Sequence, residues 1–436
     1  MAAAGALAGW PEGRTFALLL VLILPIGALA VVVPKASDRS WLPNLIGMAW
    51  VVKMLAAAAR YWALQVLYRG IGDATRYHGA GRRLAAVWRA GVVPPFDGGT
   101  EFVEVVTGLL YVPHEPTKLG GFFIFASLAF VGQLFCYTAF RHAFPSSSLK
   151  WYGVLILLIP NLLYWPASIG KDSLMVLFIG VAAYAAVRLL SNYALRWIAI
   201  FASGVAGCAV IRSHIALALV LALMLALLFG RSTHQEQVLK RVLTILAVGL
   251  VFIPIGQFAM RDFGFDSTFQ IDEAILAEVI DPVLAGVEEQ TARGGSEVQG
   301  SAIRSLVDIP GSVIRVLFRP LPNEAHNVQA FANSLVEGSL LLGLLAWRSP
   351  AIVRNLPRLW RSPYVLFSMV YTAGFIYGHS AVLNLGIMAR QRAQAIPFVI
   401  VLFVVLGFNR PASGDTNSPD IDLESTGRRL RYLTPL

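Results

Sequence analysis

The sequence predicts an all-α membrane protein, a polytopic helical bundle of about eleven transmembrane helices with two long external loops that carry short interfacial helices. Two features of the composition favour this class. Of the 436 residues, 57% are hydrophobic and only 14% are charged, whereas a soluble domain usually has about a quarter of its residues charged. The third observation is a series of apolar runs. In lipid the backbone must satisfy its own hydrogen bonds, which favours helices of about 20 residues.

The apolar runs follow one another along the chain with two interruptions. They occupy residues 15–34, 43–67, 120–140, 151–166, 172–187, 194–211, 213–229, 241–259, 334–347, 363–383 and 394–409. The interruptions, about 68–119 and 260–333, are the expected external loops of a single transmembrane domain, 1–409. The tail 410–436 is rich in Ser, Asp, Pro and Arg, which is typical of a disordered segment, here cytoplasmic.

Basic residues in alternate connections set the expected orientation, because short cytoplasmic loops carry an excess of Lys and Arg. These connections hold only Asp38 and Glu236 as acids, against Lys35, Arg39, Arg141, Lys150, Arg188, Arg196, Arg231, Lys240, Arg241, Arg348, Arg354, Arg358 and Arg361. The two long loops are therefore expected outside a plasma (inner) membrane, facing the periplasm or the exterior. The net charge of +10 fits this pattern and membrane lipids, so no nucleic acid partner is expected.

With this orientation, the polar residues that flank or interrupt the apolar runs collect on the outer face. Ionisable groups at membrane depth are costly unless they are paired or hydrated, so each is a candidate site residue. In chain order they are Asp73, Arg76, Tyr77, His78, Lys171, Arg212, His214, Arg319, Glu324, His326, Arg390 and Arg392. Asp73 is the preferred catalytic residue because it stands at a helix exit among hydrogen-bonding groups.

These residues also have structural interpretations. Asp73 can cap a helix, and a cation near a helix end can anchor at the interface. The remaining structural interpretations are a helix start for Lys171 and Asp172, an ion pair for Arg212, interfacial anchoring for Arg390 and Arg392, and packing for His379.

The candidate residues combine two chemical abilities. Fixed cations, arginine above all, suit a phosphate or pyrophosphate carried on a lipid. A nearby carboxylate suits a general base that takes the proton of an attacking hydroxyl. The sequence contains no Walker loop, dinucleotide fingerprint, metal-spaced His/Cys cluster or Gly-x-Ser-x-Gly elbow. We therefore expect group transfer from a lipid phosphate without a cofactor.

The segment 72–78, Gly-Asp-Ala-Thr-Arg-Tyr-His, resembles the first external loop of the multi-span GT-C glycosyltransferases, especially bacterial members that make cell-surface glycans. In that loop an acid follows a span and precedes a juxtamembrane helix. Segments 165–172, 211–214 and 318–327 are similar to segments of relatives of this group. Residues 390–397 are similar to the last spans of O-antigen polymerase-like proteins.

The resemblance implies transfer of a sugar from a polyprenyl-phosphate-linked donor to a glycan or lipid-linked acceptor. By that resemblance, Asp73 activates or positions the acceptor. The donor phosphate is then held by Lys171, Arg212, Arg319 and Arg390 or Arg392, and the substrate site is lined by Arg76, Tyr77, His78, His214, Glu324 and His326. The chain departs from the family in two ways. An additional span precedes the acidic loop, and a second acid beside Asp73 is missing, which disfavours a divalent metal.

Two other functions remain open at this point. One is a polysaccharide polymerase or ligase of the O-antigen type, which would use the same external cations and depend less on Asp73. The other is a transporter or flippase for a lipid-linked saccharide. Transporters usually place charges at the bilayer midplane on helices related by an internal repeat, whereas the charges here are expected near one surface.

Overall fold

The computed structural model describes most of the predicted transmembrane domain. It covers residues 41–92, 99–114, 116–145, 148–230, 238–262, 302–320, 338–355 and 362–408, with the single residues 288, 324 and 331. Within these ranges the regular elements are helices, and no strand is present. The all-α prediction is therefore confirmed for the described residues. The first apolar run and the tail 410–436 lie outside them.

The helices of the first half end near the boundaries of the apolar runs. They are α3 (Trp41–Val66), α4 (Asp73–Arg89), α5 (Thr100–Tyr111), α6 (Lys118–Ala143), α7 (Leu149–Leu158), α8 (Pro160–Tyr164), α9 (Lys171–Ser191), α10 (Leu195–Ile211) and α11 (Ser213–Phe229). The short helices α4 and α5 occupy the first long loop, as predicted.

The second half contains longer connections and one sharply bent segment. Its helices are α12 (Val238–Asp262), α14 (Asp308–Phe318), α16 (Ser339–Asn355), α17 (Pro363–Ser380), α18 (Leu385–Gln391), the 3₁₀ turn η6 (Arg392–Gln394) and α19 (Ile396–Phe408). The axis bends by 64° between the α18–η6 stretch and α19. Helix α16 continues past the end of the apolar run 334–347 as far as Asn355, through a segment that contains Arg348, Ser349, Pro350 and Arg354.

Several helices are long and apolar enough to cross a membrane. By length and hydropathy these are α3, α6 and α9, and the bent pair of α18–η6 with α19 is a fourth if it counts as one span. Helices α7, α10 and α11 and part of α12 are apolar but shorter. The finer prediction of about eleven spans stays a prediction.

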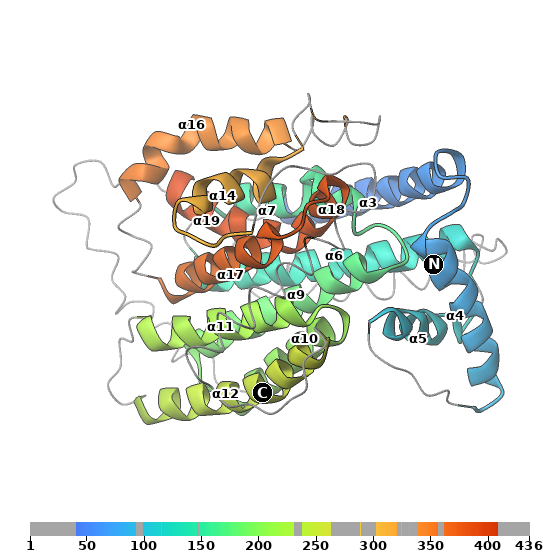
Figure 1. The fold of residues 1–436 in the computed structure, drawn as a ribbon, viewed down its shortest axis with the longest axis horizontal. Coiled ribbons are helices and arrows are strands. Elements are labelled where there is room, and N and C mark those ends of the chain that lie inside the picture. Colours follow the sequence, from blue (N-terminus) through green and yellow to red (C-terminus); the bar gives the residue numbers. More distant parts are fainter. Residues whose placement is uncertain are drawn as a thin grey trace.

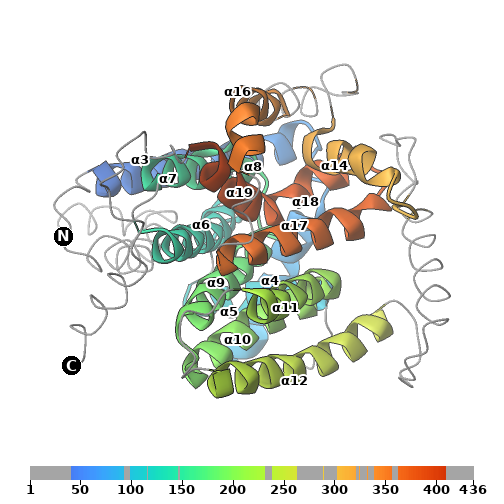
Figure 2. The ribbon, with the colours of Figure 1, turned by 90° about the vertical axis from the view of Figure 1, so that its left-hand side faces the viewer.

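Helix α6 lies at the centre of the bundle. Figures 1 and 2 show α16 and α12 on opposite sides of the molecule, with α6, α9 and α17 between them. Helices α6 and α9 approach so closely that a Cβ atom at Gly132 would lie 2.2 Å from the Val176 carbonyl oxygen, and one at Gly180 would lie 2.2 Å from the Gly132 oxygen. Both positions therefore require glycine, and the two helices form a tightly fixed pair.

Polar side chains satisfy the backbone where helices are interrupted inside the bundle. The Lys53 ammonium group on α3 donates to the Leu162 carbonyl at 2.5 Å, and the Asn161 amide donates to the Ala389 carbonyl at 2.7 Å. Free carbonyl groups in an apolar interior cost several kcal/mol. These long-range bonds therefore satisfy carbonyl groups at the end of α8 and at the end of α18, before the bend into α19.

The α4–α5 pair lies at one end of the long helices (Figure 1). The pair is closely packed, since a Cβ atom at Gly108 would lie 2.7 Å from Leu84. The Arg89 guanidinium donates to the carbonyl oxygens of Tyr111 at 2.6 Å and Val112 at 3.1 Å, at the carboxyl end of α5. Donors are needed there because the last carbonyls of a helix lack partners within the helix.

Candidate functional site

Four charged side chains from four parts of the chain form one continuous line of ionic contacts. Both terminal nitrogens of Arg212 lie 3.1 Å from Asp172 Oδ1. The other carboxylate oxygen of Asp172 accepts a hydrogen bond from Arg390 Nε. Arg390 Nη1 in turn lies 3.6 Å from Asp73 Oδ2. We call these residues the charge chain; with two acids and two arginines, its formal net charge is zero.

Local structure explains how each member reaches its place. Asp73 and Asp172 both stand in the first turn of a helix, α4 and α9 respectively, where the positive end of the helix dipole favours a carboxylate. Arg212 has an extended backbone (φ −150°) between α10 and α11, so it interrupts an apolar run. Arg390 lies in the last turn of α18, where the dipole favours a cation.

Solvent exposure is low at the Asp172–Arg212 end of the charge chain and higher at the Arg390–Asp73 end. The side chains of Asp172 and Arg212 are only 5% and 11% exposed, while those of Arg390 and Asp73 are 30% and 65% exposed. The inner ion pair is therefore held in a poorly solvated environment, where charges interact strongly. Only the outer end, Arg390 with Asp73, is open to an incoming ligand.

Tyr77 packs beside the open end of the charge chain. Its ring would lie 3.6 Å from a Cβ atom at Gly170, so the start of α9 and the middle of α4 are in contact there. Burial, and secondarily the negative charge of Asp73, raises the pKa of Tyr77. The phenol is therefore neutral at physiological pH and can serve as a hydrogen-bond donor, while a proton-accepting role belongs to the carboxylate.

Two histidines lie beside the charge chain. The rings of His214 and His379 meet edge to face, with centroids 5.5 Å apart. His379 Nδ1 lies 2.9 Å from the Phe375 carbonyl oxygen, which can only accept, so Nδ1 carries the proton. His379 Nε2 lies 2.8 Å from the side-chain amide of Gln391. The contacting atom is the amide oxygen Oε1, so a ring protonated at Nδ1 alone accepts there only when the amide is turned to present its NH₂ group. The contact links the pair to the residue after Arg390.

Three other predicted residues lie on the flanks of this arrangement. The exposed side chain of Arg76 is paired with Glu104 at 3.0 Å. His78 Nδ1 lies 3.0 Å from the Tyr111 hydroxyl, so it links α4 to α5. Lys171 begins α9 and is partly exposed. These contacts place Arg76 and His78 within the α4–α5 pair.

Arg319 and Arg392 belong to a second cluster, at the end of α14. Arg319 forms a two-pronged ion pair with Glu324, with contacts of 2.9 and 2.5 Å. Arg392 is 1% exposed and donates to the carbonyl oxygens of Val316, at 3.1 Å, and of Arg319. This capping contact gives Arg392 a structural task, so we leave it out of the proposed phosphate site. His326 lies outside the described residues.

No known protein family, curated protein or solved structure matches this chain. Among the residues that the structure describes, no group of three or more His, Cys, Asp or Glu side chains is arranged to hold a metal ion.

Sequence reasoning missed three members of this site. Asp172 was interpreted with Lys171 as a helix start, although its carboxylate joins both arginines of the charge chain. His379 is buried and stacks on Phe375, in agreement with its interpretation as a packing residue, and it also contacts Gln391, which has no sequence signal of its own. The sequence signal for these residues is their position along the chain. Each of the three lies within two residues of a predicted site residue or of a helix end.

Proposed function

We propose that this protein is a membrane glycosyltransferase that transfers a sugar from a polyprenyl-phosphate-linked donor to a glycan or lipid-linked acceptor on the extracytoplasmic face. One observation carries the proposal. A solvent-reaching carboxylate, Asp73, lies 3.6 Å from a guanidinium group of Arg390 at the end of apolar helices. This pairing supplies a base and a phosphate-binding cation in one place.

In the proposed reaction, Asp73 takes the proton of the acceptor hydroxyl while the hydroxyl oxygen attacks the anomeric carbon. The bond between that carbon and the phosphate oxygen breaks, and its electron pair leaves with the phosphate. Arg390 stabilises the developing negative charge. Attack from the side opposite the leaving group inverts the anomeric configuration.

The remaining residues act around these two. The buried pair of Asp172 and Arg212 positions Arg390 through their shared contact. Tyr77 and His214 line the sugar site, and Tyr77 donates hydrogen bonds as a neutral phenol. Because Arg390 is shared between two carboxylates, an incoming phosphate competes with Asp73 for it. Binding of the donor therefore frees Asp73 for its role as base.

The orientation in this proposal comes from the loop charges. Basic residues dominate the turns at the opposite end of the helices from Asp73, such as Arg188 in the last turn of α9 and Arg196 in the first turn of α10. Short basic loops remain on the cytoplasmic side. The charge chain would then face the periplasm or the exterior of a plasma membrane.

The proposal is tested with purified protein in proteoliposomes supplied with polyprenyl-phosphate sugars and an acceptor extract. Asp73→Asn keeps the size of the side chain but removes the base, so transfer of label should fall to background while the protein remains folded. Glu104→Gln is the matched control, because Glu104 pairs with Arg76 outside the charge chain, and it should retain activity. Full activity of Asp73→Asn would refute the mechanism.

One observation favours a second function, transport of a lipid-linked saccharide. The 64° bend between α18 and α19 is a discontinuous helix of the kind from which transporters build their sites. A sealed-vesicle experiment separates the two functions. A transporter moves labelled lipid-linked saccharide across the bilayer and forms no new glycosidic bond, whereas a transferase forms the bond.

A further inference from the structure

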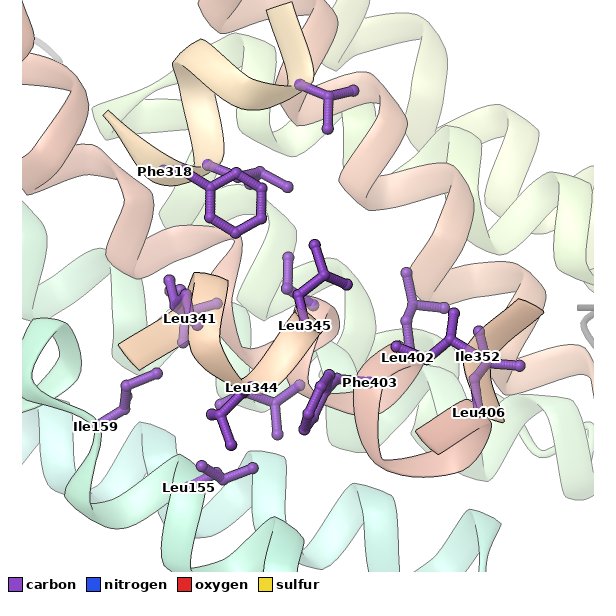
Figure 3. Close-up of a pocket in the computed structure, with 15 residues that line it drawn as sticks. Leu155, Ile159, Phe318, Leu341, Leu344, Leu345, Ile352, Leu402, Phe403 and Leu406 are labelled. Atoms are coloured by element: carbon purple, nitrogen blue, oxygen red, sulfur yellow. The ribbon is translucent and has the colours of Figure 1, made fainter. Parts of the chain in front are cut away.

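A long apolar cavity lies beside the bent segment, away from the charge chain. Its volume is about 230 Å³, and its walls come from α7, α14, α16 and α19 (Figure 3). All the lining side chains are Leu, Ile, Val or Phe. We call this cavity the α19 groove. It has no polar lining side chain, so its chemistry suits a hydrocarbon.

The α19 groove has the dimensions of a chain-binding site. One wall runs along α19 from Ile396 to Leu406, and ten residues at a rise of 1.5 Å each extend roughly 15 Å. Leu345 on α16 and Leu317 on α14 line other walls. A linear hydrocarbon lying along α19 would contact all of these walls.

The end of the α19 groove near Ile396 adjoins a cluster with positive net charge. Phe318 lines the groove, and Arg319 follows it. Arg392, four residues before Ile396, donates to carbonyl oxygens of the last turn of α14 and of Arg319. Glu324 is the acid paired with Arg319, so these two arginines and one acid sum to one positive charge. An anionic headgroup is therefore electrostatically favoured at this end.

The bent segment connects the α19 groove to the charge chain. Arg390 lies in the last turn of α18, within one limb of the segment, and Ile396 begins the other. Five residues lie between Arg390, a phosphate-binding candidate, and Ile396, the first groove-lining residue of α19. A single amphiphile can therefore place its phosphate near the arginines and its tail along α19.

We propose that the α19 groove binds the isoprenoid chain of a polyprenyl phosphate. This inference rests on the proposed function and adds to it the place of the donor's hydrocarbon tail. The branched aliphatic lining suits a methyl-branched chain, and the positive charge at one end suits its phosphate. The groove thereby orients the donor with its sugar–phosphate bond toward Asp73.

Photo-crosslinking tests this binding without any turnover. The photoreactive residue p-benzoyl-phenylalanine is placed at Leu345 or Leu402 in the groove, and at Leu55, an exposed apolar residue of α3, as the control. The protein is irradiated in phosphatidylcholine bilayers that contain a small fraction of polyprenyl phosphate. At the groove positions, the ratio of polyprenyl to phosphatidylcholine adducts should exceed that at Leu55 by at least about tenfold.

Two further arms identify the ligand. In the first arm, the added lipid is polyprenol without phosphate, or phosphatidylglycerol, and each should give weaker enrichment than polyprenyl phosphate. In the second arm, Arg319→Gln should reduce the enrichment with polyprenyl phosphate. Equal adduct ratios at the groove and at Leu55, preference for phosphatidylglycerol, or crosslinks only to the protein's own chain would each overturn the proposal. Because the crosslink needs no turnover, adducts formed without any acceptor report binding alone, which separates this test from that of the transferase activity.

Discussion

Asp172 holds two guanidinium groups in a place with almost no solvent. One of its oxygens accepts from both terminal nitrogens of Arg212, and the other accepts from Arg390. A buried ion pair is weak support for stability when both partners are considered together. Removal of one partner is different, because the remaining charge is left uncompensated. Asp172 is therefore the residue on which the folded charge chain depends.

We predict that Asp172→Ala lowers the free energy of unfolding by about 3–5 kcal/mol, because two arginines lose their buried partner. Thermal unfolding of the protein in detergent, followed with a thiol-reactive dye, measures the effect. This readout is available because Cys136 and Cys208 are both buried in the folded state.

The control for this prediction is Glu104→Ala, which breaks the ion pair between Glu104 and the exposed Arg76. A pair of this kind contributes about 0–1 kcal/mol. The double variant Asp172→Ala/Arg390→Ala should recover part of the stability lost by Asp172→Ala, because one buried charge is removed. Equal effects of the two single substitutions would contradict the assigned role of Asp172.

At the residue scale the sequence indicated part of the site. Asp73, Arg212 and Arg390 were recognisable because charged residues next to apolar runs are costly without partners. Asp172 was not recognisable as a site residue, because an acid in a first helical turn also has a purely local explanation. The capping of α14 by Arg392 could not be foreseen either, since it joins residues 76 positions apart.

At the scale of elements, the contact of α6 with α9 determines where the charge chain stands. Asp172 is in the first turn of α9, so its position depends on how α9 packs along its length. The close approach at Gly132 and Gly180 leaves no space for a side chain. The two helices are consequently held in one register.

We predict that Gly180→Ala destabilises the protein. The new Cβ atom would lie 2.2 Å from the Gly132 carbonyl oxygen, and a backbone atom cannot move aside as the end of a flexible side chain can. Gly47→Ala in α3 is the matched control, since no atom of the described residues lies within 4 Å of a Cβ there. It should be neutral or stabilising by up to about 1 kcal/mol, the usual difference between Ala and Gly in a helix.

Thermal unfolding of both glycine variants gives the comparison. Gly180→Ala should also lower transferase activity beyond its effect on stability, because a displaced α9 moves Asp172 away from Arg390. A Gly180→Ala protein as stable and as active as the Gly47→Ala protein would show that the two helices do not pack as closely as described.

Helix boundaries were largely predictable from apolar runs; α11 coincides with the run 213–229, and α9 extends the run 172–187 by a few residues. The breaks were not predictable. Periodicity does not reveal the 64° bend between α18 and α19. The bonds that stabilise such breaks join distant residues, as Asn161 and Ala389 do, and no local pattern encodes them.

At the scale of the whole molecule, the charge chain brings together α4, α9, the α10–α11 junction and α18 at one end of the bundle. The alternation of basic loops predicts that this end faces away from the cytoplasm. The number of spans and the side of the membrane remain predictions from composition.

Cysteine labelling tests the orientation. Arg83→Cys introduces an accessible thiol on the exposed face of α4, and Leu195→Cys introduces one at the start of α10, where Leu195 is 79% exposed. In right-side-out vesicles, a membrane-impermeant maleimide should label Arg83→Cys directly and Leu195→Cys only after permeabilisation. The buried native cysteines keep the background low. Labelling of the two variants in the reverse order would place the charge chain in the cytoplasm and exclude the proposed function.

The exposed contact between Asp73 and Arg390 joins two walls of the site that differ in how tightly they are packed. The tightly packed wall is α9, locked against α6 along the glycine seam. The other is the beginning of α4, which packs on α9 through Tyr77 and reaches α18 through the 3.6 Å contact of the exposed Asp73. That ionic contact costs little to break. Access for a bulky saccharide should therefore open between α4 and α18, and any substrate-driven rearrangement should be concentrated in the α4–α5 pair.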